Sequence, residues 1–162
     1  MRFTDNLLTG TLIKRYKRFF VDVKVNNQII TAHCPNSGSM LGLLDKCNKI
    51  WISKSNNPKR KLKFTLELIK VKDSLVGVNT IFANRIVLEA LNNKAIKECS
   101  KFEYIKTEAV YDANTRFDFL LKKNERKVFL EVKNVTLSTK EKIAEFPDAI
   151  TSRGTKHLIK LI

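Results

Sequence analysis

Apolar and polar residues alternate along the first half of the chain in the pattern of short β-strands. Val21, Val23 and Val25 alternate with Asp22 and Lys24, which is the period of two expected for a half-buried strand. Further β-rich runs follow, each bounded by polar or turn-forming residues. These predicted strands cover residues 28–34, 49–55, 62–71 and 75–80.

Five short strands with one brief helical insert, expected over residues 40–44, favour a small closed barrel of the OB type. The pattern changes near residue 80. From residue 83 to 99 the apolar residues recur at helical spacing, which predicts a helix. Strands are expected over residues 108–111, 115–121 and 127–135, and a helix from residue 148 to the end of the chain.

We therefore expect a mixed α+β protein with two domains. An OB-like, nucleic-acid-binding domain is expected over residues 1–80, and an α/β domain over residues 81–162. The second domain has the order helix, strand, strand, strand, helix. The boundary is a change of composition without a flexible linker.

The charge of the chain indicates a polyanionic partner. Thirty-one basic and sixteen acidic residues among 162 give a net charge of +15. Nucleic acid is the commonest partner of such a basic protein. The alternative is that a general bias toward Lys accounts for the net charge. Residues 1–80 carry fifteen basic and five acidic residues, so the first half is the stronger candidate for the contact.

Other features exclude several classes of protein. No stretch of about eighteen uncharged apolar residues exists, so we expect no membrane contact and a cytoplasmic location. Cys34, Cys47 and Cys99 are widely spaced. Zinc requires four closely spaced ligands, so we predict no zinc.

Three residues of the second half form a candidate catalytic site. Glu131 and Lys133 are one residue apart in a predicted strand and share a face. Asp118 lies in the preceding strand between two phenylalanines, and a hairpin register would bring it near Glu131. Two carboxylates with a lysine are suited to holding Mg²⁺ at a phosphate. An Asp and a Glu-x-Lys on adjacent strands after a helix form the core motif of the PD-(D/E)-x-K nucleases.

This motif has an ordinary alternative, because Glu-x-Lys occurs often by chance on exposed strands. Glu89, on the preceding helix, is a further candidate for the metal through a water molecule. The alternative, which the pattern favours, is a solvent-exposed helical glutamate.

Basic clusters provide the candidate nucleic-acid contacts. The first cluster interleaves cations with aromatic rings, as in proteins that bind single strands, and the alternative is a charged edge strand. Arg153 and Lys156 form a basic stripe on the last helix, where a solvated face is the alternative. The candidate contacts in full are Lys14, Arg15, Tyr16, Lys17, Arg18, Lys59, Arg60, Lys61, Arg153 and Lys156.

Long strings of the sequence resemble the sugar fermentation stimulation protein A family, from about residue 8 to residue 161. They are residues 31–40 (TAHCPNSGSM), 57–62 (NPKRKL), 77–80 (GVNT), 116–121 (RFDFLL), 131–137 (EVKNVTL), 146–149 (FPDA) and 153–158 (RGTKHL). The resemblance implies a DNA-binding protein with an N-terminal OB-like domain and a C-terminal PD-(D/E)-x-K-like domain. It also implies a link to the regulation of sugar (maltose) metabolism genes.

Two departures from the family pattern affect these expectations. Asp112 stands where the family has a glycine. Members of the family continue well beyond the equivalent of Leu161, so we expect the C-terminal domain to be incomplete here. Three functions remain open: a DNA-binding regulator, a Mg²⁺-dependent nuclease acting on DNA or RNA, and an RNA-binding protein.

Overall fold

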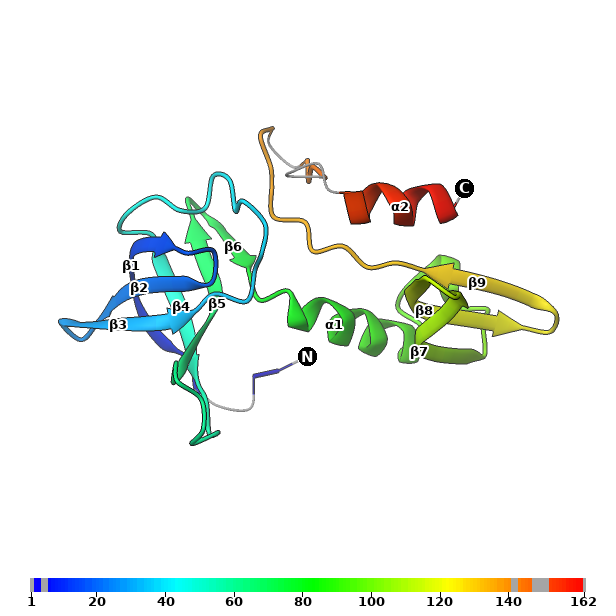
Figure 1. Cartoon of the computed structure of the whole chain (residues 1–162), viewed down its shortest axis with the longest axis horizontal. Helices are drawn as coiled ribbons and strands as arrows, with labels where there is room; N and C mark the ends of the chain where they lie inside the picture. Colours follow the sequence, from blue (N-terminus) through cyan, green and yellow to red (C-terminus); the bar gives the residue numbers. More distant parts are fainter. Residues whose placement is uncertain (1, 4–5, 141–142, 147–151, 162) are drawn as a thin grey trace. The chain divides into compact units, whose positions relative to one another are not determined.

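The computed structural model describes residues 2–3, 6–140, 143–146 and 152–161. The chain divides into two compact units (Figure 1). One unit comprises Arg2–Ile81 and Asn134–Ala149, and the other comprises Phe82–Lys133 and Ile150–Ile162. Within the described residues, no helix has the length and apolar character needed to cross a bilayer.

The first unit is a β-barrel, which confirms the predicted OB-like fold. Its strands pair in the order β3-β2-β1-β4-β5-β6, and an additional β3–β5 pairing closes the barrel over β1 to β5. The sixth strand extends the sheet as a hairpin on β5. The strands are β1 (Leu8–Tyr16), β2 (Phe20–Val25), β3 (Gln28–His33), β4 (Lys49–Lys54), β5 (Phe64–Val71) and β6 (Ser74–Gly77).

Alternation along the strands fills the barrel with aliphatic side chains. Val21 and Val23 of β2 are fully buried, as are Ile50 and Ile52 of β4. Because side chains of a strand point alternately to its two faces, the residues between them lie on the outer surface.

The prediction of a helix over residues 40–44 is wrong. Met40 and Gly42 have positive φ values of 55° and 75°, which a right-handed helix does not contain. The segment instead forms turns, although Met40 and Leu43 remain buried in the barrel. Its apolar residues reflect burial of a loop rather than helical periodicity.

The second unit has the predicted order of helix, three strands and helix. Strands β7, β8 and β9 form an antiparallel sheet, with β8 in the middle. A short 3-10 helix η1 precedes the sheet. The elements are α1 (Ile81–Asn92), η1 (Lys97–Cys99), β7 (Tyr104–Asp112), β8 (Thr115–Lys123), β9 (Arg126–Leu130) and α2 (Ser152–Leu161).

Helix α1 packs on the sheet but is shorter than predicted. Leu91 of α1 clusters with the fully buried Phe119 and Leu121 of β8. Lys94 follows the helix with a φ of 54°, a left-handed residue of the kind that ends helices. Ile86 of α1 is 53% exposed.

Candidate nucleic-acid interface and carboxylate site

Strand register brings the two predicted basic loops of the barrel to the same end. The β1–β2 loop (residues 17–19) leads into Phe20, which pairs with His33 at the end of β3. His33 also pairs with Thr65 at the start of β5, directly after the β4–β5 loop (residues 55–63). In OB-folds these two loops and the β2–β3 face are the usual binding surface.

The β1–β2 loop is exposed and carries two cations beside an aromatic ring. Lys17 and Arg18 have φ values of 45° and 62°, which make the tight turn. Phe19 is 41% exposed, and its ring centroid lies 6.3 Å from that of His33. The carbonyl of Phe19 accepts the N–H of Cys34 at 2.9 Å, which fixes the loop against β3.

The β4–β5 loop adds four cations at this end, of which Lys63 donates to the carbonyl of Pro58. Lys59 and Lys61 are exposed. The Nη2 of Arg60 donates to Oγ1 of Thr65 at 3.1 Å, so this arginine is held beside His33. Burial, and next the charge of Arg60, lower the pKa of His33 from its ordinary value. We define the basic rim as Lys17, Arg18, Phe19, His33, Lys59, Arg60 and Lys61.

Arg15, a predicted phosphate contact, has a structural role in the barrel. Its Nη2 donates to the carbonyl of Asn36 at 2.7 Å and its Nη1 to the carbonyl of Gly38 at 2.9 Å. Its Nε donates to the carbonyl of Arg18 at 2.8 Å. The guanidinium therefore joins the β1–β2 loop to the turn after β3. Because its donors are bonded to backbone carbonyls, we do not include Arg15 in the basic rim.

Lys14 and Tyr16 lie on the outer face of β1, next to β2. The Tyr16 ring stacks on Phe20 with a centroid distance of 5.6 Å, and Lys14 Nζ lies 5.4 Å from the Tyr16 centroid. Asp22 accepts hydrogen bonds from the hydroxyls of Tyr16 and Thr31 at 3.2 and 2.7 Å. The result is a fixed aromatic platform adjoining the basic rim.

In the second unit, hydrogen bonds hold Asp118 in a defined orientation. Asn84 Nδ2 of α1 donates to its Oδ1 at 2.8 Å, and the N–H of Val132 donates to its Oδ2 at 2.7 Å. The N–H of Val132 thus donates to the Asp118 side chain instead of to a carbonyl of β8. Consistent with this, β9 ends at Leu130, so the predicted strand over 127–135 is too long.

Asp118 and Glu131 lie beside the last pair of the β8–β9 ladder. Phe119 of β8 pairs with Leu130, the last residue of β9, and Asp118 and Glu131 are the chain neighbours of this pair. Glu131 and Lys133 lie just beyond β9, and the Lys133 ammonium forms an ion pair with the Glu131 carboxylate. The Glu131 side chain is 9% exposed and that of Lys133 34% exposed.

These residues have the chemistry of a site for a hard divalent cation. Asp118 and Glu131 supply carboxylate oxygens, and each oxygen of Asp118 retains lone pairs beyond its one hydrogen bond. Mg²⁺ is commonly bound by one or two carboxylates together with substrate phosphates. The described residues contain no cluster of three or more His, Cys, Asp or Glu suited to a metal, so two protein carboxylates are the most that this site offers.

The remaining predicted site residues are less informative. Glu89 is exposed on α1, five residues after Asn84 and so roughly 140° around the helix from it. Arg153 and Lys156 belong to α2, but their side chains lie outside the described part of the structure. His33 and Asn84 were not predicted as functional; each is positioned by a partner more than thirty positions away, which no local motif indicates.

Two family models cover almost the whole chain. The model described as the SfsA N-terminal OB domain matches residues 13–78, and the model described as the sugar fermentation stimulation protein RE domain matches residues 81–162. The chain belongs to the sugar fermentation stimulation protein (SfsA) family.

Curated relatives in the SfsA family match this chain over all or nearly all of its length. It is 60% identical over 162 residues to a sugar fermentation stimulation protein homolog of Pelagibacter ubique, covering 100% of this chain and 70% of that protein. It is 50% identical to the homolog of a Nostoc species, covering 96% of this chain and 67% of the relative.

A solved structure in the SfsA family has the same fold. The structure of Pyrococcus furiosus SfsA in complex with Ca²⁺ is similar with a TM-score of 0.86 at 19% sequence identity. The similarity covers 99% of this chain and 68% of the other. The predicted mixed fold with an OB-type barrel is thereby confirmed.

Proposed function

We propose that this chain binds nucleic acid, and DNA in the first place, through the basic rim of its barrel. The observation that carries the proposal is the His33–Thr65 pairing, which joins the two cationic loops at one end of the barrel. Cations on two loops span more of a phosphate backbone than cations on one, because each loop reaches a different stretch of the strand. The net charge of +15 supplies the long-range attraction.

Cations and rings have separate tasks in this interface. Lys17, Arg18, Lys59 and Lys61 are exposed and neutralise phosphates. Phe19 on the rim and the Tyr16–Phe20 pair beside it offer faces on which bases stack. Stacking is open only to unpaired bases, so this arrangement favours a single strand or an opened duplex over an intact duplex.

The proposal extends to gene regulation. The names of the relatives refer to stimulation of sugar fermentation, and DNA binding is the step through which such a protein would act on sugar (maltose) metabolism genes. Phosphate contacts alone do not read a sequence, so any selectivity for such genes must come from contacts to base edges, from DNA shape or from a further partner.

Fluorescence anisotropy with labelled oligonucleotides tests the binding. Single-stranded DNA, duplex DNA and RNA of the same sequence are titrated with the chain at low salt. Replacing Lys59 and Lys61 with Ala should weaken single-stranded DNA binding, whereas Lys70→Ala with Lys72→Ala, at the opposite end of β5, is the matched control. Absence of binding to all three would overturn the proposal, and tighter binding to RNA would replace DNA with RNA as the partner.

A second function is favoured by Asp118 and Glu131, which flank the Phe119–Leu130 pair at the end of the β8–β9 ladder. We propose a Mg²⁺-dependent phosphodiesterase activity on DNA or RNA at this site. Bound Mg²⁺ would lower the pKa of an attacking water and neutralise the phosphate. Asp118, oriented by Asn84 and the Val132 N–H, and Glu131 would hold the ion. Lys133 would stabilise the charge that develops when water attacks phosphorus and the P–O bond breaks.

Cleavage assays with Mg²⁺ or Mn²⁺, with a chelator as the blank, test this second function. Glu131→Ala should abolish cleavage and leave binding by the barrel intact. Lys133→Ala should reduce the rate about a hundredfold or more, while Glu108→Gln, on the exposed side of β7, should retain it. Equal cleavage by the Glu131→Ala protein, or none by the unaltered chain, would reject the activity.

A further inference from the structure

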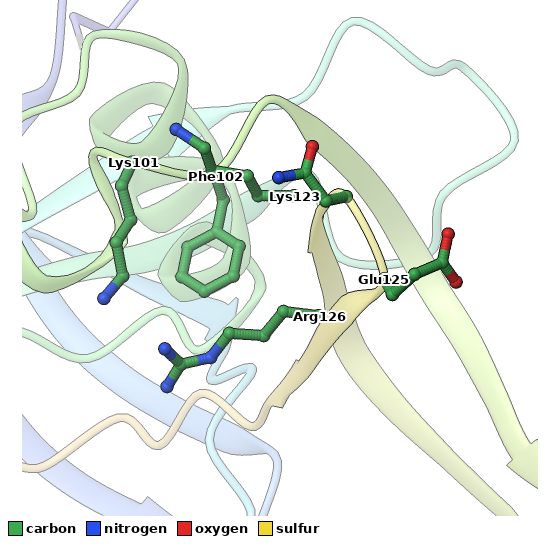
Figure 2. A pocket seen from close by; sticks show the side chains of 6 residues that line it. Lys101, Phe102, Lys123, Glu125 and Arg126 are labelled. Carbon is green, nitrogen blue, oxygen red and sulfur yellow. The ribbon is translucent and has the colours of Figure 1, made fainter.

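A cavity of about 380 Å³ lies in the second unit, where the end of the β8–β9 hairpin meets the segment after η1. Its volume is within the range of small-molecule sites. Figure 2 shows the Phe102 ring between the side chains of Lys101 and Arg126, with the Glu125 carboxylate directed away from the ring. The lining residues are Lys101, Phe102, Lys123, Asn124, Glu125 and Arg126.

The hairpin around this cavity carries like charges in unfavourable positions. Lys123 of β8 pairs directly with Arg126 of β9, and both residues line the cavity, whereas the neighbouring Lys122–Lys127 pair lies on the opposite face. Like charges directly opposite one another destabilise a β-hairpin. An anion bound beside Arg126 would offset this repulsion.

Few carboxylates offset these charges. Lys123 Nζ lies 3.7 Å from Glu103, which is 72% exposed. Among the residues that the structure describes, Lys101 and Arg126 form no ion pair with a carboxylate. Their donors are therefore available to a ligand.

Phe102 gives the cavity a fixed aromatic wall. The ring is 8% exposed and belongs to the core cluster with Leu91, Phe119 and Leu121. A ring anchored in this way loses little freedom when a ligand packs against it. The Lys101 Nζ lies 5.9 Å from its centroid, so aromatic and cationic groups meet at one place.

We propose that this cavity binds a nucleotide, with its phosphate on Lys101 and Arg126 and its base against Phe102. Two cations match the charge of a terminal phosphate, about −2, and the ring wall accounts for a preference over inorganic phosphate. The nucleotide is either free or the phosphorylated end of a strand. The site is distinct from the basic rim and does not depend on the proposed function of the barrel.

Isothermal titration calorimetry with thymidine monophosphate, inorganic phosphate and a 5′-phosphorylated oligothymidylate tests the proposal. Arg126→Glu is compared with Lys106→Glu, which makes the same charge change at an exposed position of β7. We expect Arg126→Glu to weaken binding of thymidine monophosphate about tenfold or more, because a charge-assisted bond is lost. Lys106→Glu should have little effect, and inorganic phosphate should bind more weakly than the nucleotide.

The outcomes separate the two sources of the ligand and the two sites. Binding of the phosphorylated oligonucleotide but not of the mononucleotide would identify a strand end, provided that Arg126→Glu weakens it and that an unphosphorylated oligonucleotide is unaffected. Equal losses in Arg126→Glu and Lys106→Glu, or no Arg126-dependent binding of either ligand, would overturn the proposal. Lys59→Ala with Lys61→Ala, which alters the basic rim, should leave mononucleotide binding unchanged. This result would show that the cavity and the basic rim are independent sites.

Discussion

His33 at the end of β3 pairs with Thr65 at the start of β5, and this parallel bridge closes the barrel. It also determines which loops become neighbours. Phe19 lies against His33 on one side, and Arg60 is bonded to Thr65 on the other. A feature of fold closure thus assembles the surface that we propose to bind nucleic acid.

Arg15 should matter for stability more than for binding. Arg15→Lys removes the planar group that donates to the carbonyls of Asn36 and Gly38, and lysine cannot reproduce that geometry. We expect the free energy of unfolding to fall by about 1–3 kcal/mol in urea titrations. Arg18→Lys, in the same loop, should change it by less than about 0.5 kcal/mol; equal effects of the two variants would remove the assigned role of Arg15.

The lowered pKa of His33 predicts a pH-dependent stability. The unfolded chain takes up a proton at His33 near pH 6.5, before the folded barrel does, so the free energy of unfolding should decrease as the pH falls through that value. His33→Asn should remove this decrease. His157→Asn, which alters the other histidine of the chain, should retain it, and a decrease that persists in His33→Asn would contradict the assignment.

Asp112 and Lys160 connect β7 to α2. Their carboxylate and ammonium groups lie 2.8 Å apart, and the hydrogen bond from Lys160 is the first cause that lowers the Asp112 pKa to about 2. The restraint is therefore fully present above pH 3.8 and is lost as the pH falls toward 2. We expect Asp112→Asn to speed amide hydrogen exchange in α2 at neutral pH, with Glu108→Gln as the control; unchanged exchange would mean that this pair does not hold the helix.

Local patterns in the sequence predicted the helices and strands better than they predicted the contacts between residues distant in the sequence. Alternation around Val21, Val23 and Val25 reflects one buried face of β2, so the strand could be found from its own residues. The helix predicted over residues 40–44 is absent. Met40 and Leu43 are both buried, and their spacing of three residues is also that of a buried helix face. The positive φ of Met40 cannot be inferred from the pattern of apolar and polar residues.

Long-range contacts explain what the sequence could not predict. The end of β9 depends on Asp118 accepting the Val132 N–H, a competition between a side chain and the strand ladder. The orientation of Asp118 depends on Asn84, 34 residues earlier. The sequence predicted Arg15 to be a surface cation that contacts phosphate. Its carbonyl partners could not be predicted, because they come from a turn more than twenty residues away. None of these contacts has a local periodicity.

The salt dependence of single-stranded DNA binding tests the central claim most directly. Four cations, Lys17, Arg18, Lys59 and Lys61, are assigned to phosphates, so the slope of log K against log salt should be about −3. Lys17→Ala with Arg18→Ala should reduce its magnitude by about 1.4, and Lys70→Ala with Lys72→Ala should leave it unchanged. An unchanged slope in the Lys17 and Arg18 variant would contradict the basic rim as the binding surface.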